Sequence, residues 1–303
     1  MDFHTYIHAV GTGHKGNRDL SYEESCDMMQ QLLEQHIHPE QIAAFLLGWR
    51  MKPETIEEFR GALHTLQRYT IASPIENSLE LGYPFDGKCN NPYLFPLTAA
   101  HLQQELNLIV TGDVWQPAKG GVTTQEICRH VTLSHNLYYF DRKTYCPALH
   151  SLSRIRQRLG LRSGLNTLEK LPNVAQSDTA LIGVFHKPYV TKYIDIFASH
   201  YTRFALLQGN EGTPELFSKS RLWIVENHHV SEYLVDPKRY GIDYRRSREK
   251  IDVNSSLNQL KKPKKELREL AALNAAMLLF IAKKFSTIDD AFAHLQHLDA
   301  SEA

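Results

Sequence analysis

The first seventy residues place their hydrophobic side chains at helical spacing. Segments 19–35, 38–51 and 53–69 each carry an apolar face, and the first begins with Ser21 and Glu24 at the spacing of a capping box. The positions that share these apolar faces are Met28, Met29, Leu32 and Leu33, then Ile42, Phe45, Leu46 and Trp49, then Ile56, Phe59, Leu63 and Leu66. Three short amphipathic helices with short links predict a small helical bundle.

After Ile75 the pattern changes to short apolar runs that end at polar or glycine residues. These runs are LNLIVTG (106–112), TALIGVF (179–185), RFALLQG (203–209) and RLWIVEN (221–227). Helical segments lie between them, at residues 123–135 and 151–171. Strands that alternate with helices predict an α/β domain with a mostly parallel sheet.

The chain of 303 residues is long enough for two domains. We expect a helical domain of residues 1–75, to which residues 158–178 return. Residues 76–157 and 179–303 are expected to form the larger α/β domain.

Composition narrows the class of protein. Hydrophobic residues make up 42% and charged residues 22% of the chain, which are globular values. Thirty-four Lys and Arg balance thirty-four Asp and Glu, so attraction to nucleic acid requires local clustering of charge. Four scattered cysteines without a CxxC pair predict reduced thiols. Because residues 1–19 have no apolar signal core and the apolar run 271–282 is short, we expect a cytoplasmic protein without a membrane partner.

Two stretches at expected strand ends have residue types that bind anions. In the first, Asp86 and Gly87 favour a tight turn. Lys88 adds a positive charge, and Asn90 and Asn91 add side-chain amides. These groups predict a site for a phosphate oxygen, and a solvated Asp-Gly turn is the alternative.

The second stretch follows the run LNLIVTG. Gly112 ends that expected strand, and Lys119, Gly120 and Gly121 precede a helix that begins near Thr123. Backbone N–H groups at a helix start favour an anion, and Lys119 adds a point charge. A flexible glycine linker before a helix is the alternative.

A basic cluster occupies residues 236–268, where eleven Lys and Arg face five Asp and Glu. Tyr240 and Tyr244 lie among them and are able to stack on bases. The predicted nucleic-acid contacts are Arg245, Arg246, Arg248, Lys261, Lys262, Lys264 and Lys265. A solvated lysine-rich loop is the alternative.

Four stretches together resemble the anthranilate phosphoribosyltransferase family (glycosyltransferase family 3). They are QIAAFLLGWRMKPETIEEFRGAL (41–63), RQRLGLRSGLNTLEKLPN (156–173), YLVDPKRYGID (233–243) and LNAAMLLFIAKKFSTIDDAF (273–292). The resemblance implies a small helical domain and a larger α/β domain, a fold that resembles that of nucleoside phosphorylases. It also implies a homodimer formed through the helical domain and a ligand cleft between the domains. Family enzymes transfer ribose 5-phosphate from phosphoribosyl pyrophosphate to anthranilate with magnesium.

The donor motifs of the family are altered in this sequence. A GTGGD turn is replaced by residues 85–89, where the side chains of Lys88 and Cys89 crowd the approach of a pyrophosphate. A Lys-His-Gly-Asn-Arg run is replaced by residues 110–113, which end in a carboxylate. The acidic pair for magnesium falls on Pro214 and Glu215, which leaves one doubtful metal ligand.

The acceptor pocket is altered in part. A family histidine falls on Cys146, whereas Arg156 matches an arginine near the anthranilate carboxylate. A retained guanidinium is able to bind a carboxylate or a phosphate.

The stretches FDGKCNNPYLFPLTA (85–99) and TGDVWQPAKGGVTTQEI (111–127) resemble a branch of the family that lacks anthranilate transfer and binds nucleic acid. The first hypothesis is therefore a protein that binds single- or double-stranded nucleic acid through basic residues. The second is a phosphoribosyl- or glycosyltransferase with an altered substrate, a phosphorylated sugar, which requires Mg²⁺ only if it is active. An inert dimeric scaffold for another protein is a third possibility.

Overall fold

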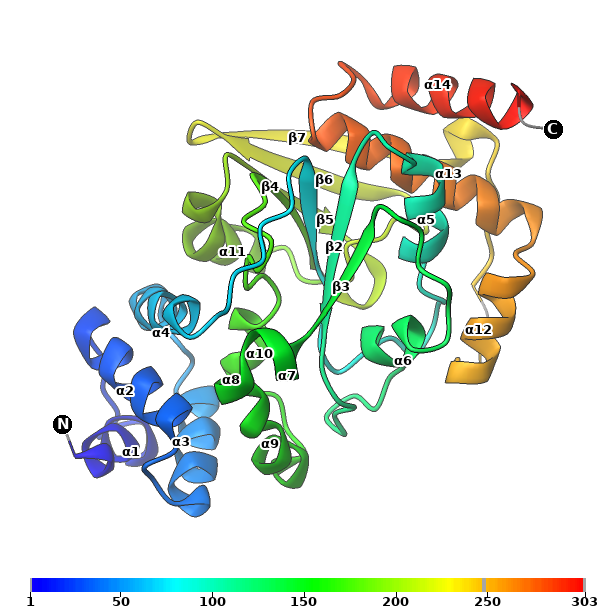
Figure 1. Ribbon diagram of the computed structural model, residues 1–303. Coiled ribbons are helices and arrows are strands. Elements are labelled where there is room, and N and C mark those ends of the chain that lie inside the picture. Colours follow the sequence, from blue (N-terminus) through cyan, green and yellow to red (C-terminus); the bar gives the residue numbers. More distant parts are fainter. Residues whose placement is uncertain (1, 247–248, 302–303) are drawn as a thin grey trace.

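The computed structural model describes residues 2–246 and 249–301. Within that part of the chain, four helices form an N-terminal bundle (Figure 1). They are α1 (Phe3–Gly11), α2 (Tyr22–Glu34), α3 (Pro39–Met51) and α4 (Ile56–Arg68). The three predicted helices are present, and the predicted capping box of Ser21 and Glu24 is formed. The helix α1 was not predicted, and it begins at an N-cap where the side chain of Asp2 accepts a hydrogen bond from His4 N.

The α/β domain is built on a sheet that has seven strands in the described part of the chain. The strands are β1 (Ser78–Gly82), β2 (Asn107–Gly112), β3 (Leu137–Asp141), β4 (Thr179–Val184), β5 (Arg203–Gln208), β6 (Ser220–Glu226) and β7 (His229–Val235). Their order is β3-β2-β1-β4-β5-β6-β7. The pairs from β3 to β5 are parallel, whereas β5–β6 and β6–β7 are antiparallel. The expectation of a mostly parallel sheet is confirmed.

Helices cover both faces of this sheet, so successive side chains of its central strands are buried on both sides. On one face, Leu79 and Leu81 of β1 belong to a core shared with the helices at the C-terminal end of the chain. On the other face, Ile182 of β4 and Phe204 of β5 belong to a core that continues into the bundle. The helices of the α/β domain beyond the linking segment are α5 (Phe95–Leu102), α6 (Thr124–Cys128), α11 (Tyr189–Phe197), α12 (Val253–Lys261), α13 (Lys265–Ile281) and α14 (Ile288–Ser301).

Short helices link the two halves of the molecule. They are α7 (Arg142–Tyr145), α8 (Pro147–Ser151), α9 (Ser153–Leu159) and α10 (Leu165–Leu168). The sequence predicted one helix over 151–171, but α9 ends at Gly160, whose φ of +66° is left-handed. Gly164, at the start of α10, lies so close to the bundle that an added Cβ would be 2.6 Å from the Trp49 ring.

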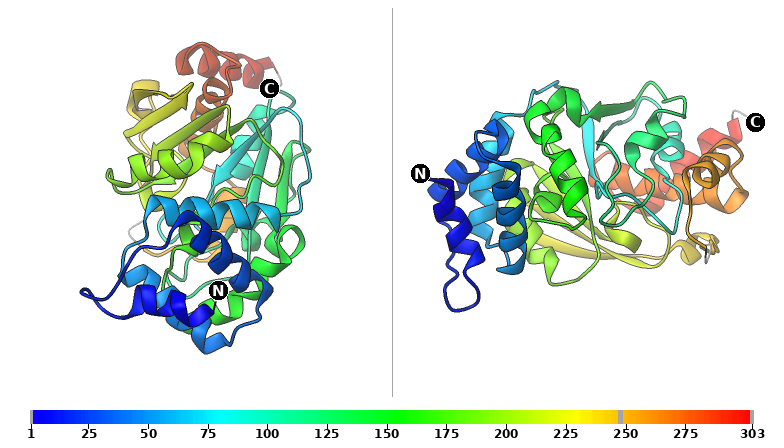
Figure 2. Two further views of the ribbon diagram at one scale, coloured as in Figure 1. Left: turned by 90° about the vertical axis from the view of Figure 1, so that its left-hand side faces the viewer. Right: turned by 90° about the horizontal axis from the view of Figure 1, so that it is seen from below.

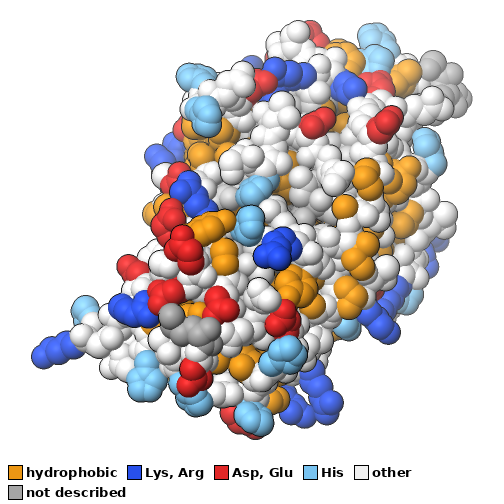
Figure 3. Space-filling view, turned by 60° about the vertical axis from the view of Figure 1, so that its left-hand side comes forward, with side chains coloured by type: hydrophobic (Ala, Val, Ile, Leu, Met, Phe, Trp, Pro, Cys, Tyr) orange, Lys and Arg blue, Asp and Glu red, His pale blue; other side chains and the backbone are white. Residues whose placement is uncertain are grey.

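The charges on the surface are mixed in sign, and the molecule is elongated. On the face shown in Figure 3, Lys and Arg side chains are interspersed with Asp and Glu. Seen from below, the bundle and α12 lie at opposite ends of the molecule (Figure 2, right). Across the described residues, no helix combines the length and the apolar character needed to cross a bilayer.

Candidate functional site

A cavity of about 260 Å³ lies beyond the carboxyl ends of the neighbouring strands β1 and β4. This is the switch point of the sheet, where the direction in which the chain adds strands reverses. After β1 the chain continues to β2, toward one edge of the sheet, and after β4 it continues to β5, toward the other edge. The loops therefore diverge and leave a crevice, which is where open α/β sheets bind ligands. Pro84 and Phe85 line it after β1, His186 after β4, and Glu211 and Gly212 after β5.

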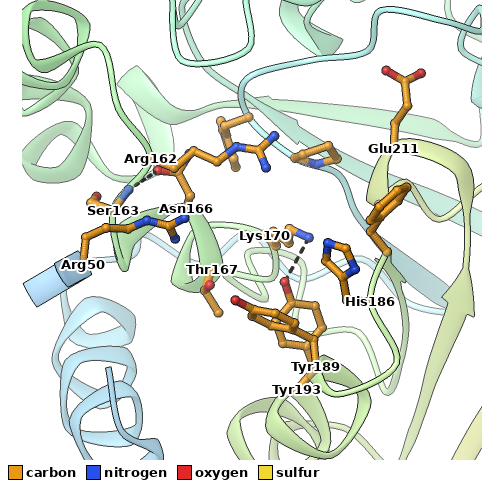
Figure 4. A pocket seen from close by; sticks show the side chains of 14 residues that line it. Arg50, Arg162, Ser163, Asn166, Thr167, Lys170, His186, Tyr189, Tyr193 and Glu211 are labelled. Carbon is orange, nitrogen blue, oxygen red and sulfur yellow. Dashed lines mark hydrogen bonds between the residues drawn. The ribbon is translucent and has the colours of Figure 1, made fainter. Parts of the chain in front are cut away.

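Cationic side chains converge on this cavity from two parts of the chain (Figure 4). Arg50 comes from α3 of the bundle, and Arg162 and Lys170 come from the linking segment. Lys170 Nζ is 3.3 Å from Gly183 O and 3.3 Å from the Tyr193 hydroxyl. Among the described residues, Lys170 and Arg50 have no ion-pair partner. The cavity is thus suited to an anionic ligand.

The two predicted anion loops lie side by side. Lys88 N donates to Val122 O at 2.9 Å, and Val122 N donates to Lys88 O at 2.8 Å. Gly87 has a φ of +82°, and an added Cβ would be 2.4 Å from Val122 O. Gly121 approaches equally closely, since its Cβ would be 2.6 Å from Lys88 N. These glycines serve the contact between the loops.

Lys88 itself does not face the cavity. Its ammonium is buried, forms an ion pair with Glu215, and donates to Pro92 O at 2.7 Å. It also lies 4.6 Å from the centre of the Phe217 ring. Burial lowers the pKa of Lys88, and the carboxylate of Glu215 opposes that shift. Lys88 therefore holds two loops together inside the protein, in place of the phosphate contact that its sequence position predicted.

Both carboxylate oxygens of Glu215 are engaged by protein donors. Its Oε1 accepts hydrogen bonds from the Tyr83 hydroxyl at 2.8 Å, Leu94 N at 2.6 Å and Phe95 N at 3.1 Å. Its other oxygen holds Lys88. Glu215 does not line the cavity, and both of its oxygens already accept from protein donors, so this carboxylate is placed as the partner of Lys88 and not as a metal ligand.

Glu211 occupies the backbone donors of the first loop. Its Oε1 accepts from Cys89 N at 2.7 Å and forms an ion pair with Lys119 Nζ at 2.9 Å, and its Oε2 accepts from Asn90 N at 3.0 Å. Burial raises the pKa of Glu211, but Lys119 and the two amides outweigh it and hold that pKa below the ordinary value. The predicted combination of the loop and Lys119 therefore exists, with a carboxylate of the same chain in it.

The other residues of the two loops serve local structure. Asp86 is buried, and its carboxylate accepts from Arg162 Nε at 2.5 Å. Asn91 is buried beside the Tyr244 hydroxyl, at 3.4 Å. Thr123 caps α6 in a reciprocal capping box with Glu126, at the predicted start of a helix, but that helix has only five residues. Gly120 has a φ of +66° in the turn before Gly121.

Gly112 and the carboxylate after it lie beside a buried charge cluster. An added Cβ on Gly112 would be 2.6 Å from Thr124 Oγ1. Asp113 accepts from Ser153 Oγ at 2.7 Å and pairs with Arg142 at 3.1 Å. It therefore faces protein donors and not a ligand phosphate. Burial raises the pKa of Asp113, but Arg142 and the hydrogen bonds outweigh it, so the pKa is lowered.

The two predicted acceptor-pocket residues do not line the cavity. Arg156 is buried and holds Glu169 with two hydrogen bonds, at 2.6 and 2.8 Å. The thiol of Cys146 is buried in the core that continues into the bundle, and burial raises its pKa. Two cations that do line the cavity, Arg162 and Lys170, lie in the stretch where the sequence predicted one continuous helix. The break at Gly160 and the Ser-Gly pair at 163–164 were the available signal.

The basic segment lies at the far end of the molecule, around a groove of about 990 Å³ beside α12. Arg245, Arg246, Lys262 and Lys264 line the groove together with Asp243, Asp252 and Glu266. Lys261 and Lys265 are exposed next to it. Arg248 lies outside the described residues. The structure thus brings the six described cations of the prediction to one corner, which we call the basic corner.

Two family models match this chain. The model for a glycosyl transferase family, helical bundle domain, matches residues 4–69, and the model for a glycosyl transferase family, a/b domain, matches residues 123–301. An uncharacterized protein of Aquifex aeolicus (strain VF5) is 27% identical over 92% of this chain and 93% of its own length. An anthranilate phosphoribosyltransferase of Neisseria meningitidis is 25% identical over 90% of this chain and 85% of its own length.

Solved structures share the fold. Anthranilate phosphoribosyltransferase from Thermus thermophilus has a TM-score of 0.74 at 18% identity, covering 98% of this chain and 94% of that chain. The Saccharomyces cerevisiae enzyme in complex with PRPP and Mg has a TM-score of 0.76 at 13% identity, covering 97% and 92%.

The positions that the family resemblance assigns to magnesium, 214 and 215, do not provide a ligand set. Pro214 has no side-chain ligand atom, and both oxygens of Glu215 are engaged by protein donors. Over residues 2–246 and 249–301, no group of three or more His, Cys, Asp and Glu side chains is placed to hold a metal ion. Pro214 and Glu215, which stand at the positions that the family resemblance assigned to magnesium, therefore do not fit the ion.

Proposed function

Because the chain belongs to the glycosyl transferase family of the anthranilate phosphoribosyltransferases, we propose that it keeps the family fold without the donor chemistry and binds nucleic acid at the basic corner. The contacts of Lys88 support the first half of this proposal. In a donor site, cations and metal ligands must remain open to the pyrophosphate. Here the ammonium of Lys88 and the carboxylate of Glu215 neutralise each other inside the protein.

The proposal of nucleic-acid binding rests on the exposure of the cations at the basic corner and on their lack of ion-pair partners. Arg246, Lys261, Lys262 and Lys264 are exposed and have no ion-pair partner among the described residues. Elsewhere many cations are neutralised, as Lys52 is by Asp19 and Glu58. Exposed, unpaired Lys and Arg side chains around a long groove are the groups that bind a phosphate backbone and release its counterions.

A salt titration with a labelled oligonucleotide tests this proposal. We expect Lys261→Ala/Lys262→Ala and Lys264→Ala/Lys265→Ala each to lower the affinity at low salt about tenfold. Each lost phosphate contact reduces the slope of log affinity against log salt by about 0.9 for duplex and about 0.7 for single strands. Lys283→Ala/Lys284→Ala is the matched control, because these exposed lysines follow the other end of α13. No binding at low salt, or an equal loss in the control, would refute the proposal.

The cavity at the switch point supports a second candidate, transfer of a sugar from a phosphorylated donor with an altered substrate. Arg50, Arg162 and Lys170 are placed to orient a sugar phosphate. A thermal-shift panel of sugar phosphates and phosphoribosyl pyrophosphate, each with and without Mg²⁺, tests it. A stabilising ligand whose effect disappears in Arg50→Ala and Lys170→Met would support transfer chemistry, and no shift with any of them would count against it.

A further inference from the structure

The contacts of Glu211 have the pattern of a bound phosphate. A carboxylate presents two oxygens in a plane, and here they receive two consecutive backbone N–H groups and one ammonium. Two edge oxygens of a phosphate have nearly the same separation and accept from the same kinds of donor. The donors at Cys89, Asn90 and Lys119 thus form an anion cradle, and its occupant is part of the chain.

The turn that carries Glu211 leaves room for its side chain to move. Glu211 has a φ of +65°, a left-handed conformation that is unfavourable for a residue with a side chain. Gly209 precedes this short turn and Gly212 ends it, and Gly212 also has a positive φ, of +69°. Glu211 and Gly212 line the cavity at the switch point, so a displaced side chain has open space beside it.

Within the cradle, the carboxylate of Glu211 neutralises the ammonium of Lys119. With Glu211 removed, Lys119 would lose the carboxylate that it pairs with, and the two amides would lose their acceptor. Lys119 is 19% exposed and Glu211 6%, so an anion is able to reach the ammonium once the carboxylate has moved.

We propose that the amides of Cys89 and Asn90, together with Lys119, form a phosphate-binding site that Glu211 closes from within the chain. A phosphate group binds there by taking the place of the Glu211 carboxylate. The ligand chemistry is a phosphate monoester or diester, and its source is inorganic phosphate, a mononucleotide or a strand. This site lies outside the basic corner, and it does not require the proposed function to be correct.

Calorimetry with inorganic phosphate, in chloride buffer at pH 7, tests the proposal on the full chain. Glu211→Gly removes the carboxylate and suits the left-handed backbone. Glu211→Gln keeps the size of the side chain but presents an amide N–H group where one of the donors requires an acceptor. Glu76→Gln is the matched control, because Glu76 is exposed and precedes the amino end of β1, whereas the cradle lies beyond its carboxyl end.

We expect Glu211→Gly and Glu211→Gln to bind inorganic phosphate at least tenfold more tightly than the natural chain, and Glu76→Gln to bind as the natural chain does. Adding Lys119→Met to either variant should abolish the gain. An affinity in both Glu211 variants equal to that of Glu76→Gln would overturn the proposal, and so would a gain that survives Lys119→Met.

Parallel titrations identify the source of the phosphate. Adenosine monophosphate and a short oligonucleotide replace inorganic phosphate in the same variants, with thermal unfolding as the check that each variant is folded. A gain for all three ligands indicates a site for any phosphate group, and a gain for the small ligands alone indicates a site closed to strands. Oligonucleotide binding that depends on Lys261 and Lys262 is measured separately, so loss of one proposal leaves the other standing.

Discussion

At the scale of single residues, the buried pair of Lys88 and Glu215 is expected to stabilise the loops at the sheet edge. Lys88→Met should lower the free energy of unfolding by about 3–5 kcal/mol, because it leaves the Glu215 carboxylate buried without its cation. Lys88→Met/Glu215→Gln should recover most of that loss, since a neutral amide oxygen still accepts from Tyr83 and Leu94. Urea unfolding of the three proteins measures both values. A Lys88→Met variant as stable as the natural chain would show that the pair does not stabilise these loops.

The buried carboxyl group of Glu80 should make the free energy of unfolding depend on pH. It lies buried in β1 and accepts from the Tyr201 hydroxyl at 2.5 Å and from Asn173 N at 3.1 Å. Burial raises its pKa from 4.5 to about 7, although both hydrogen bonds oppose the shift. The native state therefore keeps this proton to a higher pH than the unfolded state, and stability falls as the pH rises from about 4.5 to 7.

The variant Glu80→Gln isolates that contribution, because glutamine resembles the protonated acid. A shift of this size corresponds to roughly 3 kcal/mol. We expect the natural chain to lose about that much stability relative to Glu80→Gln between pH 5 and pH 8. Chemical unfolding of both proteins at several pH values measures the difference, and parallel curves for the two would disprove the assignment.

Residue types in the sequence predicted charges at the sheet edge but not their partners. Lys88 and Glu215 lie 127 residues apart in the chain, and Glu211 lies more than 120 residues from the amides that it accepts. A local pattern shows that a turn carries a lysine. Only the folded chain shows whether a carboxylate from another loop has already neutralised that lysine.

At the scale of elements, periodicity predicted the parts that bury a regular face. The three helices α2, α3 and α4 and the strands β2, β4, β5 and β6 each have such a face and were found. The five-residue strands β1 and β3 were missed because they are too short for a pattern. The helix expected over 151–171 is interrupted because Gly160 ends α9 and Gly164 must approach Trp49.

Two glycines of that interrupted segment should respond differently to a methyl group. Gly164→Ala would place Cβ 2.6 Å from the ring of Trp49, which is fully buried and cannot move aside, so we expect a loss of about 1–3 kcal/mol. Gly160→Ala meets no atom within 4 Å, and only its φ of +66° is unfavourable, so about 1 kcal/mol is expected. Gly160→Asn should recover part of that loss, because asparagine tolerates this conformation, whereas Gly164→Asn should be worse than Gly164→Ala. Thermal unfolding of the four variants provides the ranking.

At the scale of the whole molecule, one core joins the bundle to the sheet. Trp49 and Phe59 of the bundle, Leu168 of the linking segment and Ile182 and Phe204 of the sheet belong to the same buried cluster. The ribbon views in Figures 1 and 2 show the linking helices between the bundle and the sheet. Unfolding the bundle alone would expose apolar surface on the linking segment and the sheet, which costs free energy in proportion to its area. The two parts should therefore unfold together.

Two tryptophans make this expectation measurable, because Trp49 reports on the bundle and Trp223 on β6. The variants Trp115→Phe/Trp223→Phe and Trp49→Phe/Trp115→Phe each keep one reporter. Within each variant, the urea midpoint from tryptophan fluorescence should coincide with the midpoint from far-UV circular dichroism, as cooperative unfolding requires. Comparison within a variant removes the stability change that each substitution causes, including loss of the hydrogen bond from Trp49 to Glu58. If the bundle were an independent unit, Trp49 fluorescence would change at a lower urea concentration than the dichroism, while Trp223 would follow the bulk of the sheet.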